Sequence, residues 1–260
     1  MNTMMTLEDI HAIGRMREEE LEEARAIQSM MMPHESLRTD AVVVSHGYQP
    51  VATVGGDFVD YFELLDGTVG IYLGDVCGKG VPAALYAALA VGTLRGFRKT
   101  GQMPDVLLSL LNSQLFLRGT PRRHCALQYA VFDPRNQDMH VTSAGMPPPL
   151  HLPSQGDCRF LELGGIPPGL FASVKYESSS IHLQSGDSVL FFTDGVTDAL
   201  NLRDEEFGCQ RLLAVCDAHR GLAPDKLLEH IFASIGSFTH GQEQHDDMAA
   251  AVFCFSTARQ

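Results

Sequence analysis

The stretch Gly74-Asp75-Val76-Cys77-Gly78-Lys79-Gly80 constrains this chain more than any other. Before it, alternating apolar residues from Val69 to Leu73 share one face with Asp75, which predicts a buried strand over 68–75. After it, an Ala- and Leu-rich segment predicts a helix over 81–98. The glycines allow a sharp turn between the two. Because a buried carboxylate is costly without a cation or strong donors, we expect Asp75 to face one or the other.

Hairpins and paired helices dominate the rest of the pattern. The strands expected at 57–64 and 68–75 are joined at Asp66-Gly67, a strong hairpin signal. Further strands are expected at 41–48, 124–132, 139–143, 148–152, 159–163, 180–183, 188–193 and 247–255, and further helices at 104–117, 205–216 and 224–235. This order predicts an α+β domain with antiparallel sheets rather than alternating β-α units.

Residues 6–32 predict an acidic helix that ends at Pro33. Its apolar residues fall into two short groups with helical spacing, which are Leu7, Ile10 and Ile13, then Leu21, Ala24, Ile27 and Met31. The charged segment 17–20 separates the groups, so a continuous coiled coil is not supported. Two alternatives stay open: the helix packs on its own domain, or it pairs with a second copy.

Composition excludes several classes of partner. The formal net charge of −13 argues against nucleic acid or an anionic membrane, since both require clustered Lys and Arg. The six cysteines contain no C-x-x-C pair, a pattern typical of reduced cytosolic thiols. The longest apolar run, 81–91, is too short to cross a bilayer, and Glu8 and Asp9 do not suit a signal peptide. We therefore expect a cytoplasmic protein that binds neither nucleic acid nor membrane.

Four aspartates lie at the ends of predicted strands, and these are Asp57, Asp75, Asp194 and Asp246, the last followed by Asp247. In the hairpin, Asp57 and Asp75 become neighbours if the register holds. Four carboxylates at one edge would suppress one another's ionisation unless cations were bound, and oxygen ligands select Mg²⁺ or Mn²⁺. Two such ions would activate a water for hydrolysis of a phosphate ester. Taken singly, each aspartate equally suits a turn or a helix cap.

Five motifs in order carry a family resemblance, and these are Gly55-Gly56-Asp57-Phe58-Val59-Asp60, Gly74-Asp75-Val76-Cys77-Gly78-Lys79-Gly80, Ser143-Ala144-Gly145-Met146-Pro147-Pro148, Thr193-Asp194-Gly195-Val196-Thr197-Asp198-Ala199 and Asp246-Asp247-Met248. They resemble the motif set of the metal-dependent protein phosphatases, and most closely the bacterial SpoIIE/RsbU-like serine phosphatase branch. The resemblance runs from about residue 22 to 255. It includes 24–33, which is similar to the linker helix of that branch.

The resemblance implies a β-sandwich of two antiparallel sheets flanked by helix pairs, with a linker helix over 1–33 and a phosphatase domain over 34–260. It also implies two Mn²⁺ or Mg²⁺ ions at one end. Asp75 matches the bridging ligand and the Val76 carbonyl a backbone ligand. Asp194 and Asp246 match carboxylates of the first ion, and Asp57 matches a direct or water-mediated ligand. The residues expected to support these ligands without binding an ion are Gly56, Gly78, Gly195 and Asp247.

Three positions depart from the family pattern. Cys77 stands where eukaryotic relatives place a histidine thought to be the general acid. The phosphate-gripping arginine of those relatives has no obvious counterpart, and Val59 replaces a usual aromatic residue. The resemblance therefore implies that a metal-bound water protonates the leaving group and that intrinsic turnover is slow.

Other motif interpretations are weaker. The segment 78–83 follows a strand and opens a helix, as in a dinucleotide site, but no acidic residue near position 100 is placed to hold a ribose. The segment 74–79 is one residue short of a P-loop. His240 and His245 with Asp246 suggest either a zinc site or, more simply, a charged surface loop. Cys77 suits a small packing residue better than a nucleophile.

The resemblance implies a Mn²⁺- or Mg²⁺-dependent phosphoserine/phosphothreonine protein phosphatase, acting on a phosphorylated STAS-type anti-sigma-factor antagonist. An alternative is a regulatory binding module that keeps the fold and docks a partner without useful turnover. A broad phosphomonoesterase is a third hypothesis. Regulatory input is expected from a partner that docks on residues 6–32, or from dimerisation through them.

Overall fold

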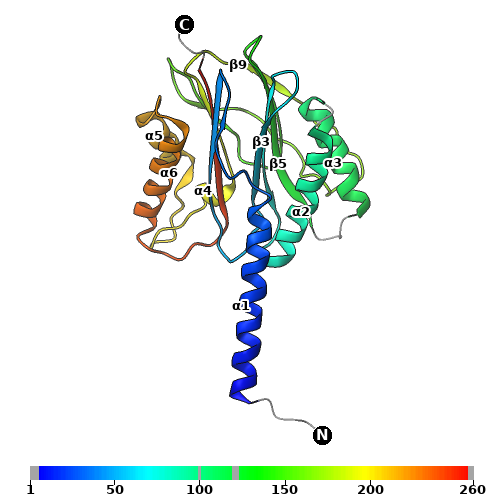
Figure 1. The fold of residues 1–260 in the computed structure, drawn as a ribbon. Helices are drawn as coiled ribbons and strands as arrows, with labels where there is room; N and C mark the ends of the chain where they lie inside the picture. The colour runs from blue at the N-terminus through cyan, green and yellow to red at the C-terminus, as the bar shows by residue number, and fades with distance from the viewer. Residues whose placement is uncertain (1–5, 99–100, 119–122, 257–260) are drawn as a thin grey trace.

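Two antiparallel β-sheets face each other in the structure, a computed structural model that describes residues 6–98, 101–118 and 123–256 (Figure 1). Sheet A contains, in spatial order, β1 (Leu37–Arg38), β2 (Val42–Gln49), β11 (Met248–Phe255), β10 (Ser188–Phe192), β7 (Leu150–Leu152) and β8 (Arg159–Phe160). Sheet B contains β3 (Phe58–Glu63), β4 (Val69–Val76), β5 (Cys125–Asp133), β6 (Asp138–Ala144) and β9 (Ser179–His182).

A pair of helices covers the outer face of each sheet (Figure 1). The pair on sheet B is α2 (Gly80–Phe97) and α3 (Pro104–Arg118), and the pair on sheet A is α5 (Gly208–Ala218) and α6 (Pro224–Thr239). A single turn, α4 (Asp194–Thr197), follows β10. The predicted α+β sandwich with paired helices is confirmed.

Strand alternation divides the buried side chains into three layers. In β4, Val69, Ile71 and Leu73 belong to the layer between the sheets, whereas Tyr72 and Val76 pack toward α2 and α3. The face predicted from the sequence is therefore correct, and it carries Asp75 toward the space between the sheets. A third layer lies between sheet A and its two helices.

Several boundaries differ from the prediction. The strand expected at 159–163 pairs only over Arg159–Phe160, and Leu161 instead donates its backbone N–H to the Pro149 carbonyl. The helix expected from 205 begins at Gly208, because Leu200 and Glu206 form a β-bridge. Local propensity contains no signal for these tertiary contacts.

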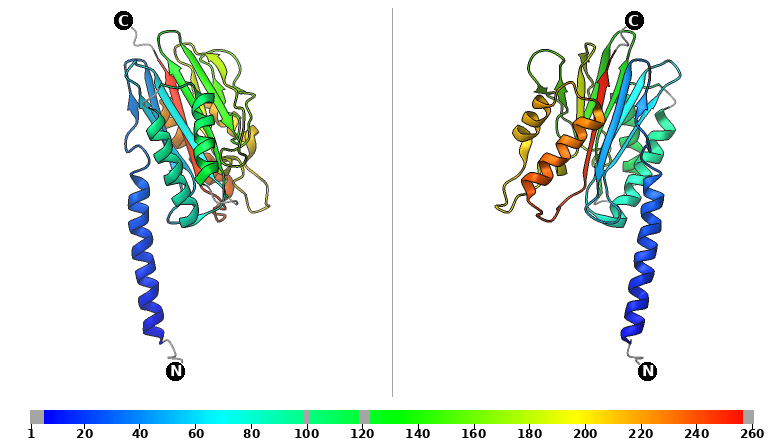
Figure 2. Two further views of the ribbon diagram at one scale, coloured as in Figure 1. Left: turned by 90° about the vertical axis from the view of Figure 1, so that its right-hand side faces the viewer. Right: turned by 60° about the vertical axis from the view of Figure 1, so that its left-hand side comes forward.

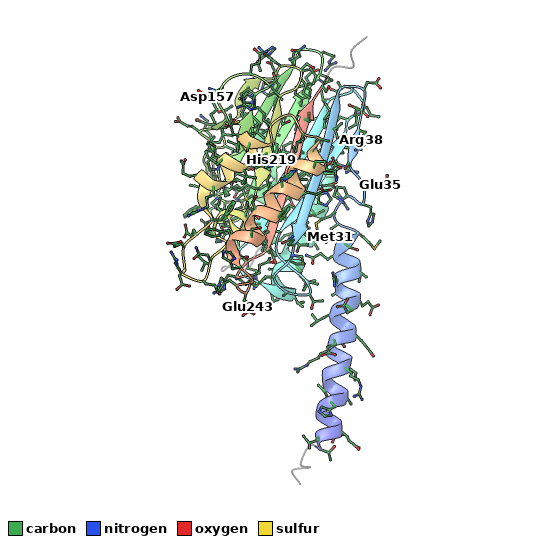
Figure 3. All side chains as sticks on the ribbon, turned by 90° about the vertical axis from the view of Figure 1, so that its left-hand side faces the viewer. Met31, Glu35, Arg38, Asp157, His219 and Glu243 are labelled. Atoms are coloured by element: carbon green, nitrogen blue, oxygen red, sulfur yellow. The ribbon has the colours of Figure 1, made fainter. Side chains whose placement is uncertain are left out.

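The helix α1 (Leu7–Ser29) starts at a capping box between Thr6 and Asp9 and projects away from the sandwich (Figures 1 and 2). Figure 3 shows its side chains extending into solvent on all sides, with Met31 at the junction. The exposed apolar residues include Leu7, Ile13 and Ile27. Packing on its own domain is limited to the last turn, so that alternative is wrong for most of the helix. Pairing with a second copy, and the domain division at residue 33, stay predictions.

The helix α2 corrects one estimate from the sequence. By length and composition alone, Gly80–Phe97 is long and apolar enough to cross a membrane, although the uninterrupted apolar run 81–91 is not. A core helix of a globular domain passes the same test, and α2 packs its buried residues, including Ala87 and Leu94, on sheet B. The predicted cytoplasmic location stays a prediction.

The layer between the sheets is expected to respond strongly to truncation of Phe132. This ring is fully buried, and its centroid lies 5.0 Å from those of Phe253 and Phe255. Phe132→Ala should lower the free energy of unfolding by about 3–5 kcal/mol in urea denaturation, because it leaves a cavity. Leu65→Ala, at a fully exposed position, serves as control and should change that free energy by less than about 0.5 kcal/mol. Equal effects of the two substitutions would contradict this assignment of the core.

Candidate metal centre

Asp57 and Asp75 are brought together by the hairpin of β3 and β4. The register pairs Phe58 with Gly74, so the residues immediately beyond this pair lie opposite each other. Asp57 is 2% exposed, and its carboxyl group lies near enough to that of Asp75 for the two groups to shift each other's pKa. The neighbours predicted from the hairpin register are therefore neighbours in the structure.

Sheet A supplies the other acids at the same edge. Asp194 follows β10, and Asp246 and Asp247 precede β11, which pairs antiparallel with β10. Both Asp194 and Asp246 lie near enough to Asp75 to raise the pKa of its carboxyl group. Two strand ends from each sheet thus meet in one acidic cluster.

Thr193 joins the two halves of this cluster. Its side chain is fully buried and its Oγ1 donates a hydrogen bond of 2.8 Å to Asp57 Oδ2. The same hydroxyl accepts the Ala249 backbone N–H at 2.9 Å, and the Thr193 N–H donates to the Ala249 carbonyl at 2.9 Å. The carboxyl group of a residue on sheet B is therefore held by a residue at the end of β10.

The electrostatics of the cluster call for positive charge. Burial, followed by the charge of Asp75, raises the pKa of Asp57 well above its usual range. Burial and then Asp194 raise the pKa of Asp75 to about 7. Burial, Asp198 and Asp246 raise the pKa of Asp194. Since each shift comes from desolvation and like charge, a cation at this edge would favour the ionised forms.

Two glycines and Asp247 shape the surroundings of the cluster. A Cβ on Gly56 would lie 2.8 Å from the Val76 carbonyl oxygen, so glycine leaves that oxygen unobstructed. Asp247 is 4% exposed and accepts the Gly56 N–H at 2.6 Å and the Val51 N–H at 2.8 Å. A Cβ on Gly195 would collide with the Asp247 carbonyl oxygen. Asp247 therefore ties the loop before Asp57 to the start of β11.

The loop after Asp75 is held by two basic side chains. Gly78 has a φ of +97°, and Arg123 Nη1 donates to the Cys77 carbonyl at 2.8 Å. Lys79 Nζ lies 3.6 Å from Asp246 Oδ2 and donates to the His245 carbonyl. Arg123 is thus a basic residue beside the loop that follows Asp75, and the sequence analysis did not identify it.

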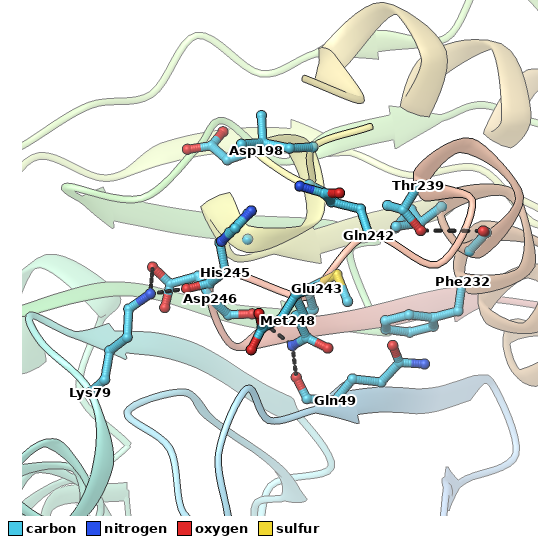
Figure 4. Close-up of a pocket in the computed structure, with 16 residues that line it drawn as sticks. Gln49, Lys79, Asp198, Phe232, Thr239, Gln242, Glu243, His245, Asp246 and Met248 are labelled. Atoms are coloured by element: carbon cyan, nitrogen blue, oxygen red, sulfur yellow. Dashed lines mark hydrogen bonds and ion pairs between the residues drawn. The ribbon is translucent and has the colours of Figure 1, made fainter. Parts of the chain in front are cut away.

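A pocket of about 320 Å³ opens beside Asp246 (Figure 4). Lys79 and His245 lie on one side, and Phe232 and Ile235 of α6 supply apolar lining. Gln244 Nε2 donates to the Gln49 carbonyl at 2.8 Å and so fastens the loop before β11 to β2. The acidic edge therefore adjoins a recess with both polar and apolar walls.

The acidic side chains described at this edge do not converge on a common point. Within the described ranges, no group of three or more His, Cys, Asp or Glu side chains lies close enough to hold an ion. Asp246 is about half exposed and paired with Lys79. The donors that do meet at this edge are carboxylates and the Val76 carbonyl, a set that suits Mg²⁺ or Mn²⁺ in its chemistry. The individual ligand roles stay predictions.

The zinc alternative finds no support in this region. His240 is the C-terminal cap of α6 with a φ of 50°, and His245 is engaged through its carbonyl by Lys79. No His-containing ligand group was found in the part of the chain that the structure describes. The interpretation as a surface loop agrees with this geometry.

Three contributing residues escaped the sequence analysis. Thr193 was part of a motif but received no role, although a hydroxyl next to a strand-end aspartate is a usable signal. Arg123 lies far along the chain from the residue it contacts, and no local pattern marks it. Gln28 lies in the segment 24–33 that resembles the linker helix, but the resemblance gave it no role. Gln28 bonds to the backbone of Gly55, two residues before Asp57.

Similar solved structures define the class of fold. The SiaA-PP2C domain of Pseudomonas aeruginosa superposes with a TM-score of 0.82 at 20% identity, covering 94% of this chain and 99% of that one. The catalytic domain of the serine/threonine protein phosphatase PstP, solved in complex with two manganese ions, gives a TM-score of 0.62 at 13% identity, covering 83% of this chain and 99% of that one. The sandwich with an acidic edge is therefore a PP2C-type fold.

Sequence comparison then gives the family. The family described as Stage II sporulation protein E (SpoIIE) matches residues 65–256, and the chain belongs to it. Protein IcfG of Synechocystis sp. is 28% identical over 256 residues, covering 88% of this chain and 40% of IcfG. The phosphoserine phosphatase RsbU of Bacillus subtilis is 25% identical over 237 residues, covering 90% of this chain and 69% of RsbU. The chain thus spans two fifths of IcfG and about two thirds of RsbU.

The raised pKa values predict how pH affects the metal-free protein. Because the folded Asp57, Asp75 and Asp194 bind protons more tightly than the unfolded chain does, the free energy of unfolding should fall as pH rises from about 4 to about 7. Urea denaturation in EDTA at pH 5 and pH 7.5 measures this slope. Asp75→Asn should flatten it, whereas Asp225→Asn, in the first turn of α6, should leave it unchanged. An equal slope in the parent and Asp75→Asn would contradict this electrostatic account.

Proposed function

We propose that this chain is a metal-dependent serine/threonine protein phosphatase that hydrolyses phosphoserine or phosphothreonine on a regulatory protein. The observation that carries the proposal is the cluster of buried acids, built from both sheets, in a member of the SpoIIE family. The similarity to RsbU, a phosphoserine phosphatase that this chain matches over 69% of its length, supports the same activity.

In this proposal Asp57, Asp75, Asp194 and Asp246, with the Val76 carbonyl, hold two Mn²⁺ or Mg²⁺ ions. Such ions, when bound, lower the pKa of water and stabilise charge on phosphoryl oxygens. The two manganese ions of the PstP structure support this cofactor.

The chain's own residues prepare the site. Thr193 orients the Asp57 carboxyl group through its 2.8 Å hydrogen bond. Asp247 holds the loop at Gly56, whose missing side chain leaves the Val76 carbonyl accessible. In this proposal Lys79 separates from Asp246 when that carboxylate binds an ion. The free-energy cost is small, because both side chains are about half exposed and exposed ion pairs contribute about 0–1 kcal/mol.

The substrate that we propose is a phosphorylated STAS-type anti-sigma-factor antagonist, as the resemblance to the RsbU-like branch implies. The pocket beside Asp246 supports a protein substrate, because the partly buried Phe232 lines it and can contact residues next to the phosphorylated one.

One observation favours a second candidate, a binding module that docks its partner without useful turnover. The ion pair of Lys79 with Asp246 occupies a carboxylate that the phosphatase needs for metal. The two candidates differ in whether divalent ions displace Lys79 and allow turnover.

Hydrolysis of p-nitrophenyl phosphate with and without Mn²⁺ tests the activity. We expect a Mn²⁺-dependent rate in the parent protein and a loss of roughly 100-fold or more in Asp75→Asn, since even residues that only support metal ligands contribute about 10–100-fold. Asp225→Asn is the control and should keep the parent rate. A parent protein without a Mn²⁺-dependent rate points to the binding module, and an unimpaired Asp75→Asn means that the site is misplaced. Phosphoserine and phosphothreonine peptides then separate protein substrates from small esters.

We also propose that residues 6–32 receive the regulatory input, from an upstream regulator or a second copy. The exposed apolar residues of α1 support this, because an isolated helix is marginally stable in water without tertiary packing.

Removal of residues 1–20 tests this role while keeping Gln28 and the junction. If α1 pairs with a second copy, light scattering should give twice the 28.4 kDa monomer mass for the full chain and the monomer mass for the truncated one. If that pairing is the regulatory input, the Mn²⁺-dependent rate on p-nitrophenyl phosphate should change together with the mass, and an unchanged rate and mass would exclude this role. A full chain with the monomer mass would exclude the dimer and leave docking of an upstream regulator as the proposed input.

A further inference from the structure

The base of α1 contains one buried side chain, and it is polar. Gln28 is 6% exposed, whereas the other side chains described within Leu7–Ser29 are exposed or half-buried. Both groups of its amide bond to one residue: Nε2 donates to the Gly55 carbonyl at 2.6 Å, and the Gly55 N–H donates to Oε1 at 3.1 Å. The two bonds reach the peptide units on either side of the Gly55 Cα, so Gln28 fixes the backbone there, because losing either bond leaves a buried polar group unpaired.

The segment that Gln28 holds has little other support. Residues 50–57 belong to no strand or helix. Asp247 also binds this segment, accepting the backbone N–H groups of Val51 and Gly56. A side chain on Gly55 would collide with the Asp247 carboxylate and the Tyr48 hydroxyl, so the backbone at Gly55 passes close to both of these groups.

The clamped segment leads directly into the candidate centre. Gly56 faces the Val76 carbonyl, and Asp57 follows it with its carboxyl group between Asp75 and Thr193. Ligand groups of a metal site have to be held to within about 0.5 Å, and the residues behind them supply that restraint. A shift of the Gly55 backbone therefore moves both Gly56 and Asp57.

A second contact secures the end of the helix without touching this segment. Arg95 of α2 donates to the Met31 carbonyl at 2.7 Å and to Asp60 Oδ2 at 2.8 Å. Met32 is buried in the layer between the sheets. The junction is thus anchored at two places, of which Gln28 alone contacts the glycine pair before Asp57.

We infer that Gln28 is a positioning residue for the metal centre, setting the placement of Gly55-Gly56-Asp57 through its paired hydrogen bonds to Gly55. The inference rests on the proposed function for its metal readout, and on geometry alone for its second readout.

Gln28→Leu tests the inference, since leucine keeps a similar volume and removes both hydrogen bonds. Electron paramagnetic resonance of free Mn²⁺ gives the dissociation constant, which should rise by about 10-fold or more. Two controls are matched to it. Ser29→Ala alters an exposed neighbour whose hydroxyl donates to the Ala26 carbonyl, and Met32→Ala loosens the same junction without touching Gly55; both should keep the parent dissociation constant.

Amide hydrogen exchange of the metal-free protein is the second readout. Gln28→Leu should speed exchange at the Gly55 and Gly56 amides, while amides in β4 and β11 keep the parent rates and show that the variant is folded. Unchanged exchange at Gly55 and Gly56 overturns the inference, as does a Mn²⁺ affinity that Met32→Ala weakens equally. If the parent protein and Asp75→Asn bind Mn²⁺ equally, the proposed metal site fails, and the exchange data alone decide the role of Gln28.

Discussion

The burial of carboxyl groups at the edge where the two sheets meet governs the rest of this structure. Asp57 has almost no contact with solvent, and Asp75 and Asp194 lie close by, an arrangement that costs several kcal/mol per ionised group without compensation. The chain compensates with the Thr193 hydroxyl and, in the proposed function, with divalent cations. In that proposal the same cost favours the binding of hard ions.

The sequence predicts those parts of the centre that depend on local periodicity. The turn at Asp66-Gly67 and the alternation in β4 determine the hairpin register, and with it the pairing of Asp57 and Asp75. The antiparallel partners of β10 follow from the fold class. Contacts between distant side chains carry no such signal. That Lys79 pairs with Asp246 and that Arg123 holds the Cys77 carbonyl depend on how the loops pack, which no spacing encodes.

Local sequence pattern also did not predict where some helices begin or which of their faces are exposed. The helix α5 begins at Gly208 rather than at 205 because Leu200 and Glu206 form a β-bridge, and helix propensity does not predict that pairing. The helix α1 was predicted over 6–32 and is observed over Leu7–Ser29, yet periodicity cannot tell whether an apolar face is covered. Among its described side chains the buried one, Gln28, is polar and lies outside both apolar groups identified from the sequence. A buried amide that bonds to backbone contributes nothing to a hydrophobic pattern, so only coordinates could reveal it.

The division of the acidic cluster between the sheets has a consequence for how the molecule folds. Sheet B carries Asp57 and Asp75, sheet A carries Asp194, Asp246 and Asp247, and the Thr193 hydroxyl meets Asp57 only after the sheets have stacked. Before that, the carboxylates of each sheet remain hydrated and far from those of the other sheet. A ligand that requires all of them binds only the sandwich with both sheets stacked, and by mass action it stabilises that assembled state.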